Sequence, residues 1–528
     1  MIGKRSPNHS LFDVGYVYPV DLKPSSFYYQ LAVVSKDLFR DDDFADLYSR
    51  TKGRPSVPPS QLALMLVLQT HDVVSDQEAV ERSCYDARWC SVLGKNLCEP
   101  MCAKSTLQLF RSQLILLDGY HTMFLASIDR AKSAGLIDGK ALTAALDTKP
   151  IIGRGAVEDT YNLLATGMRQ LARALARQNK SSIADYLVAN GLPILAAPSV
   201  KGAVAVDWSD DEQTRQFLGE LVDYARGLLA LAADGNAHVR KEAQLLEQLI
   251  LQDIDENPDG GNPSIKQGTP RDRIPSATDP EQRHGRKSSS KRFNGHKASI
   301  CADVESGLIV GYDVIAGNAA DDVGALEIVE QAEADVGVPI GEIIGDCAYG
   351  SGKTRQEFAD AFRTLIAKVP KESDNAGFFP KRAFAIDLIA GNVTCPGGKT
   401  TNDYVAHGDG GRTFRFGSHC RGCLLREQCT TAKNGRTLSV HPHEATLREA
   451  RQYQNSEEGR TKLRKRLVAE NVLARLAHLG IGQARYIGTA KTKFQLAMAA
   501  TVANLRLTAN RRLHQEVNES QMVYANAA

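Results

Sequence analysis

The chain has 528 residues, and its 64 Lys and Arg nearly balance 62 Asp and Glu, for a formal net charge of +2. Hydrophobic residues make up 43% and charged residues 24%, which excludes a wholly disordered or collagen-like chain. No apolar run reaches the roughly 18 residues of a membrane span, and the N-terminus lacks the apolar core of a signal peptide. We therefore expect a multidomain cytoplasmic protein without membrane contact, in which the 10 cysteines are thiols.

Residues 1–135 are predicted to form a helical N-terminal domain. Pro58, Pro59 and Ser60 precede an apolar run, and the tetrads SDQE (75–78) and STLQ (105–108) fit the capping box that starts a helix. Compact helical units of this kind bind DNA in helix-turn-helix proteins, but others are interaction domains. Spacing alone does not separate these two roles.

A strand and a helical block are predicted next. Within residues 136–156, the small and apolar run 141–146 indicates a short buried strand with Asp147 at its C-terminal end. Across residues 157–256, apolar side chains recur at helical spacing, which predicts helices packed on one another. Residues 257–292 are rich in Pro, Gly and Ser, so we expect an exposed, flexible linker. This linker is also basic, with 8 Lys and Arg against 3 acids over residues 271–297.

Strands and helices alternate over residues 293–370. Residues 296–303 and 308–314 read as a hairpin, followed by a helix over about 322–332 and a strand over 342–345 that ends at Asp346. A helix from about residue 353 and a strand over 364–369 complete the pattern. This alternation predicts a mixed α/β sheet.

A loop-rich insertion with a cysteine cluster is predicted for residues 371–455. Four cysteines lie within 35 residues, and four thiolates suit tetrahedral Zn²⁺; they are Cys395, Cys420, Cys423 and Cys429. A structural Zn²⁺ site is one interpretation, and a group of free thiols is the other. A second group, Cys84, Cys90, Cys98 and Cys102, has irregular gaps and reads as small buried hydrophobes.

Residues 456–515 are predicted to form basic helices that carry Glu470, followed by a frayed tail at 516–528. Over residues 431–515 there are 16 Lys and Arg against 5 Asp and Glu, an excess of +11. So large an excess favours a polyanionic partner over a merely solvated face. We expect four side chains beside Glu470 to contact DNA phosphates: Lys462, Arg464, Lys465 and Arg466.

Three carboxylates stand out by their placement. Asp147 and Asp346 each follow a short apolar strand, and Glu470 lies on a helix, at separations of 199 and 124 residues. Only the fold can bring them together, and three convergent carboxylates suit two Mg²⁺ or Mn²⁺ ions at a phosphate. Asp303 and Asp321 are rival ligands, but they read better as hairpin and turn residues.

Several strings resemble, in the same order, segments of insertion-sequence DDE transposases. GDCAYGSGKTR (345–355) is similar to the GD-x-x-Y signature around the second Asp of that family. Residues 53–69 and 75–89 resemble its N-terminal helical domain, 146–162 its first-Asp segment, and 283–309 with 315–322 the strands before the second Asp. Residues 464–507 resemble the helix that carries the family's Glu, which places Glu470 at that position.

The resemblance implies a mixed α+β fold, in which the helical N-terminal domain precedes a ribonuclease-H-like α/β catalytic core with a helical insertion and the Cys-containing insertion. It implies a polynucleotidyl transferase that uses Asp147, Asp346 and Glu470 with Mg²⁺ or Mn²⁺ to cut and join double-stranded DNA. Element ends and target DNA are the expected partners, a homodimer on DNA is expected, and no small-molecule substrate is implied.

Some features keep alternatives open. Relatives carry Tyr and Lys on the last helix where this chain has Leu463 and Ala477, which leaves Arg475 or His478 to contact phosphate in place of the Lys. A catalytically idle, DNA-binding repressor and a nuclease without strand transfer remain rival functions. A recombinase that uses Tyr486 beside Arg485 as nucleophile has only that pair in its favour.

Overall fold

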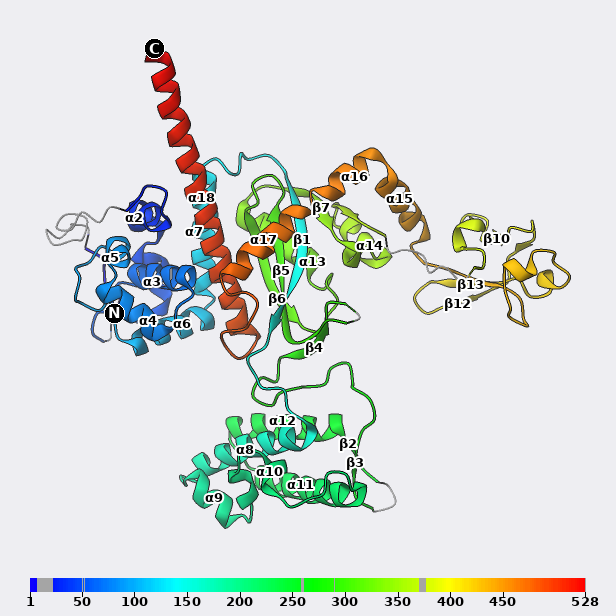
Figure 1. The fold of residues 1–528 in the computed structure, drawn as a ribbon, viewed down its shortest axis with the longest axis horizontal. Coiled ribbons are helices and arrows are strands. Elements are labelled where there is room, and N and C mark those ends of the chain that lie inside the picture. Colours follow the sequence, from blue (N-terminus) through cyan, green and yellow to red (C-terminus); the bar gives the residue numbers. More distant parts are fainter. Residues whose placement is uncertain are drawn as a thin grey trace.

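The computed structural model describes residues 1–6, 22–49, 51, 53–257, 261–288, 290–369 and 377–527, with side chains up to residue 511. Figure 1 shows a central sheet with the N-terminal helices on one side. A second group of helices lies at one end of the sheet, and a strand-rich segment extends away on the other side. Among the described residues, no helix combines the length and apolarity that a bilayer span needs.

The N-terminal region is helical, as predicted. Ser75 caps its helix as expected, because the Ser75 hydroxyl accepts the Glu78 N–H at 3.1 Å. The STLQ pattern is misleading, since Ser105 lies inside a helix whose cap residue is Ala103 and whose start has no side-chain cap. The helices are α2 (Phe27–Leu38), η1 (Asp41–Leu47), α3 (Pro59–Asp72), α4 (Asp76–Tyr85), α5 (Ala87–Leu93), α6 (Lys104–Leu116) and α7 (Gly119–Ser133).

The central sheet has the order β4-β5-β1-β7-β8, and β6 also pairs with β5. Strands β4, β5 and β6 are joined by antiparallel pairing, β5 is antiparallel to β1, and β7 and β8 run parallel to β1. The predicted hairpin and the later strands are therefore present. Their bounds are β1 (Leu142–Ile152), β4 (Arg283–Arg286), β5 (Arg292–Asp303), β6 (Ile309–Ala316), β7 (Ile340–Gly345) and β8 (Thr364–Ala367).

Strand β1 is longer than predicted, so Asp147 lies within it and not at its end. Residues 142–145 pair with β7 on one side, whereas pairing with β5 on the other side continues to Ile152. The polar segment after Leu146 stays extended because β5 satisfies its backbone. On its β7 side, the described structure has no strand partner from Leu146 to Ile151, and a parallel bridge to Gln483 follows at Ile152.

Helices cover both faces of the sheet and join it to the N-terminal region. Helices α17 (Leu467–His478) and α18 (Thr489–Ala527) contribute to the same hydrophobic core as α3, α7 and the sheet. Helix α18 runs through the predicted tail to Ala527, and only residue 528 of that tail lies outside the described residues. The remaining helices of this part are α13 (Ala325–Val336), η3 (Cys347–Tyr349), α14 (Gly352–Asp360) and α16 (Glu457–Arg464).

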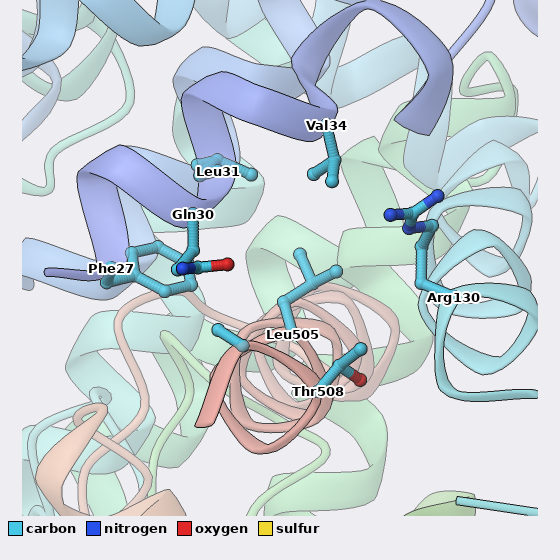
Figure 2. Close-up of a pocket in the computed structure, with 8 residues that line it drawn as sticks. Phe27, Gln30, Leu31, Val34, Arg130, Leu505 and Thr508 are labelled. Atoms are coloured by element: carbon cyan, nitrogen blue, oxygen red, sulfur yellow. The ribbon is translucent and has the colours of Figure 1, made fainter. Parts of the chain in front are cut away.

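A small apolar gap marks the contact between α2, α7 and α18. Figure 2 shows Leu31 and Val34 of α2 facing Leu505 and Thr508 of α18, with Arg130 of α7 beside them. Side chains from the two ends of the chain therefore pack against each other.

The helical block has a hydrophobic core of its own. The segment after it is less exposed than predicted, because Ile274 and Ala277 are buried in that core and Asp279 and Gln282 are fully buried. Residues 283–286 then form β4. The prediction of an exposed linker is thus wrong for residues 274–286. The polar composition of the segment gave no sign that these few residues are buried. The elements are α8 (Thr160–Gln178), α9 (Ile183–Ala189), η2 (Pro193–Ala196), α10 (Val200–Ala203), α11 (Asp211–Leu231), α12 (Ala237–Asp253), β2 (Ile254–Asp255) and β3 (Ser264–Ile265).

The cysteine-containing region forms short strands where loops were expected. One small sheet has the order β11-β10-β9 and another β12-β13-β14, around a core that includes Phe384, Phe414 and Phe416. Strands of two to four residues are too short to show a clear alternation in sequence. The elements are η4 (Lys381–Ala383), β9 (Ala385–Asp387), β10 (Asn392–Thr394), β11 (Thr400–Thr401), β12 (Tyr404–Ala406), β13 (Arg412–Arg415), η5 (Gly417–Cys420), η6 (Arg426–Gln428), β14 (Thr437–Val440) and α15 (Glu444–Asn455).

Candidate active site

The register of β1 and β7 brings Asp147 and Asp346 close together. Ala145 pairs with Ile344 in parallel, and each aspartate lies two residues beyond that pair. The backbone of β7 leaves the sheet at this point, because Asp346 caps η3 by accepting the Ala348 N–H at 2.7 Å. The two carboxylates therefore meet at one edge of the sheet.

Helix α17 packs on β1 and supplies Glu470 to the same place. All three carboxylates line one pocket of about 440 Å³, together with Arg466 and a set of basic residues. The helical segment that leads to Glu470 is broken into α16 and α17 at Lys465 and Arg466, and Glu470 lies in the first turn of α17.

The neighbouring charges of this pocket act on the Asp147 carboxyl. Burial, and after it the negative charges of Asp346 and Glu470, raise the pKa of the Asp147 carboxyl to about 6. The Thr148 N–H, which donates to Asp147 at 2.8 Å, and the Arg466 guanidinium act in the opposite direction. Arg466 also lies 2.7 Å from Glu470. A divalent cation would relieve the remaining repulsion, and carboxylate oxygens are the ligands that Mg²⁺ prefers.

These carboxylates share a pocket without forming a preassembled cage. In the described part of the chain, no group of three or more His, Cys, Asp or Glu side chains is placed to hold a metal ion. Glu470 instead forms an ion pair with Arg466, four residues earlier in the chain.

Tyr349, the tyrosine of the GD-x-x-Y string, lies in the fold behind the carboxylates. It is buried, and this burial together with the nearby charges of Asp147, Asp321 and Asp346 raises the pKa of its hydroxyl. The tyrosine therefore stays neutral. Its ring is part of the main hydrophobic core and so anchors η3, the turn that Asp346 caps.

Residues that sequence reasoning missed also line the pocket: Lys149, Arg286, Lys287 and Lys297. Lys297 is nearly buried on β5, and its ammonium donates to Asp321 and to the Ala319 carbonyl, at 2.6 Å each. Asp321, interpreted as a turn residue, thus faces the pocket as well. In the sequence, only the basic stretch 283–297 indicated positive charge near the carboxylates. Asp303 does act in the hairpin turn, where it accepts bonds from the Ser306 N–H and hydroxyl.

The four predicted phosphate-contacting residues have different surroundings. Lys462 lies 2.5 Å from Glu342 and 3.4 Å from Glu458, so its charge is already paired. Arg466 pairs with Glu470. Arg464 and Lys465 are exposed, and neither has an ion pair among the described residues.

The two suggested substitutes for the missing lysine are not in the pocket. The Arg475 guanidinium donates to the Gly307 carbonyl at 2.5 Å, in the turn between β5 and β6, and His478 ends α17. Tyr486 is packed beside Arg111 and Arg485 and lines a different hollow, away from the carboxylates. Its geometry gives the recombinase alternative no support.

The cysteines of the late insertion gather around one small hollow, which all four of them line. Cys395 and Cys423 flank Gly397, while Cys420 accepts the Arg436 N–H at 3.4 Å. Within the described residues the four side chains do not form a metal-binding group, so the zinc site stays a prediction. In the N-terminal group, Cys84, Cys90 and Cys102 are buried as expected, but Cys98 is exposed.

Comparison with known families agrees with the resemblance seen in the sequence. Residues 394–508 match a family model described as "Transposase DDE domain", and residues 20–113 match one described as "Transposase domain (DUF772)". The first match includes Glu470, and the second covers most of the N-terminal helices. No curated protein and no solved structure matches the chain. The two family matches support an insertion-sequence DDE transposase, and that family implies a divalent metal cofactor.

Proposed function

We propose that this chain is an active DDE transposase, which binds the ends of a mobile element and performs metal-dependent DNA strand cleavage and strand transfer. The observation that carries the proposal is the single pocket lined by Asp147, Asp346 and Glu470. Two strands and one helix, distant in sequence, supply these carboxylates. An idle, DNA-binding relative has no need to keep all three in one pocket.

A ribonuclease-H-like core is part of this proposal. The antiparallel strands β6, β5 and β1 followed by the parallel strands β7 and β8 support it. In this interpretation, the helical block is inserted after β1, and the cysteine-containing region is inserted between β8 and the helix that carries Glu470. None of the described residues that line the carboxylate pocket comes from either insertion.

In the proposed mechanism, Asp147, Asp346 and Glu470 hold Mg²⁺ or Mn²⁺. When bound, the cations would activate the attacking hydroxyl and stabilise the leaving oxygen at the scissile phosphate. Lys149 and Lys287, at the same pocket, balance the phosphate charge. Arg464 and Lys465 are exposed on the neighbouring helix break and are suited to grip the DNA backbone. Because two element ends must be joined to one target, we also propose a homodimer on DNA.

An assay on duplexes that carry the DNA flanking the reading frame tests the proposal. With Mg²⁺, we expect the protein to cut the strand end and to join it to a target plasmid, and we expect Asp346→Asn to abolish both reactions. Retained cleavage in Asp346→Asn would overturn the assignment of this residue. Binding without cleavage by the unmodified protein would favour the repressor, and cleavage without joining would favour the nuclease.

A further inference from the structure

A basic hairpin borders the candidate active site. Strands β4 and β5 pair from Arg283 and Gly295 to Arg286 and Arg292, and the Lys287 N–H donates to the Lys291 carbonyl at 2.9 Å to close the turn. Between Glu281 and Asp303 the chain has six Lys and Arg and no acidic residue. The strand pair therefore carries a concentrated positive charge at the edge of the sheet.

A groove of about 770 Å³ runs beside this hairpin. Its walls include Arg271, Arg286, Arg292 and Lys297, with His284 nearby, and none of the described residues that line it carries a carboxylate. Arg286 and Lys297 also line the pocket of the three carboxylates. The groove and the candidate active site thus share a wall, so one extended ligand can occupy both.

Most of this charge lacks an internal partner. Lys297 pairs with Asp321, but Arg271, Arg286 and Arg292 are exposed and have no ion pair among the described residues. Arg286 and Arg292 lie directly opposite each other in the strand pair. Like charges in such positions destabilise a sheet. A polyanion in the groove would remove this cost.

We infer that the groove and the β4–β5 hairpin bind the phosphate backbone of duplex DNA as it leaves the candidate active site. This inference rests on the proposed function and adds a path for the DNA. Guanidinium groups match phosphate oxygens in a two-pronged geometry, and such contacts position a duplex without reading its sequence. Asn294 adds a neutral donor to the same wall, whereas the Asn318 amide already donates to the Arg271 carbonyl and to Asp272.

The test removes two groove charges that are not in the carboxylate pocket. We expect Arg271→Gln with Arg292→Gln to weaken binding of fluorescent duplex DNA on the order of ten- to a hundredfold at about 0.1 M salt, alike for flanking and unrelated sequences. The log–log salt slope should fall by about 1.8, at roughly 0.9 for each phosphate that the protein no longer neutralises. A matched control, Arg382→Gln with Arg421→Gln, removes two exposed arginines from the cysteine-containing region and should leave the slope unchanged.

The lysine double variant, Arg271→Lys with Arg292→Lys, keeps the charge and should restore most of the slope, which separates charge from folding. An unchanged affinity and slope in the glutamine variant would overturn the inference. Because binding is measured without Mg²⁺, the result does not depend on cleavage. Cleavage by the unmodified protein together with unchanged binding in the glutamine variant would support the transposase and contradict the groove. Weakened binding in the variant without cleavage by the unmodified protein would support the groove in a repressor.

Discussion

Glu470 and Arg466 form the pair on which the charge balance of the candidate active site depends. They lie one helical turn apart, with 2.7 Å between guanidinium and carboxylate. Arg466 also opposes the charges of Asp346 and Glu470 that raise the pKa of Asp147. Arg466 is thus a cation that offsets the two acidic neighbours of Asp147. A divalent ion would take over that role, which frees Arg466 to face phosphate.

Replacing Glu470 by Gln tests the third carboxylate. The amide keeps the size of the side chain but loses its charge, so we expect cleavage to fall at least about a hundredfold while DNA affinity is retained. Glu305→Gln, an exposed glutamate in the β5–β6 turn, is the matched control and should retain cleavage. Cleavage at the normal rate in Glu470→Gln would mean that another residue completes the site.

At the scale of elements, Asp76 joins α4 to three other segments. Its carboxylate accepts bonds from Gln69 of α3, from Arg111 of α6 and from Arg485 before α18. Burial alone would raise its pKa, but the Arg111 and Gln69 bonds outweigh that effect and hold the pKa of Asp76 below its usual value. The network therefore fixes the N-terminal helices to the C-terminal part of the core.

We expect Asp76→Asn to lower the free energy of unfolding by about 3 kcal/mol, because it leaves the nearly buried Arg111 without its counter-charge. The pKa is lower in the folded state than in the unfolded state. This stabilisation is therefore complete above about pH 5 and is lost as the pH falls further. Urea unfolding at pH 7 measures the first effect, and repeating it at pH 4, 3 and 2 follows the loss. Asp138→Asn, an exposed pair with Lys140, should change little.

The small sheets of the cysteine-containing region bury few large side chains, so a bound metal would add much to their stability. We predict about one Zn²⁺ per chain in protein purified without chelator, and a lower content in Cys420→Ser. Cys98→Ser removes an exposed thiol elsewhere and serves as the control. A metal-free preparation with the same melting temperature would leave the free-thiol interpretation.

At the scale of the whole molecule, the hydrophobic interior is divided. One core unites the N-terminal helices with the sheet, α17 and α18, whereas the helical block has a separate core. Separate cores can unfold separately, so a single two-state transition is not expected.

Calorimetry should resolve at least two unfolding transitions. Leu171→Ala removes a fully buried side chain from the helical block, and Leu64→Ala removes one from the larger core. Each change should cost about 2–5 kcal/mol, and each should lower a different transition. If both variants lower the same transition, the two cores unfold as one unit.

Local patterns were sufficient for most helices and for the hairpin, because amphipathic periodicity and caps such as Ser75 act over a few residues. They failed where stability comes from distant partners. The linker prediction missed Ile274 and Ala277, whose burial depends on helices that precede them in the chain. The strands of the cysteine-containing region were missed because each is too short to show a period.

Asp147, Asp346 and Glu470 can be named from the sequence alone, since they occupy the positions that the resemblance marks. Tertiary structure decided that they line one pocket, through the parallel register of β1 with β7 and the packing of α17 on β1. It also decided that Lys297, Asp321 and the basic hairpin belong to the same surface. Electrostatic interactions depend on the distance between charges in space. Sequence separation predicts that distance only for residues that are close together in the chain.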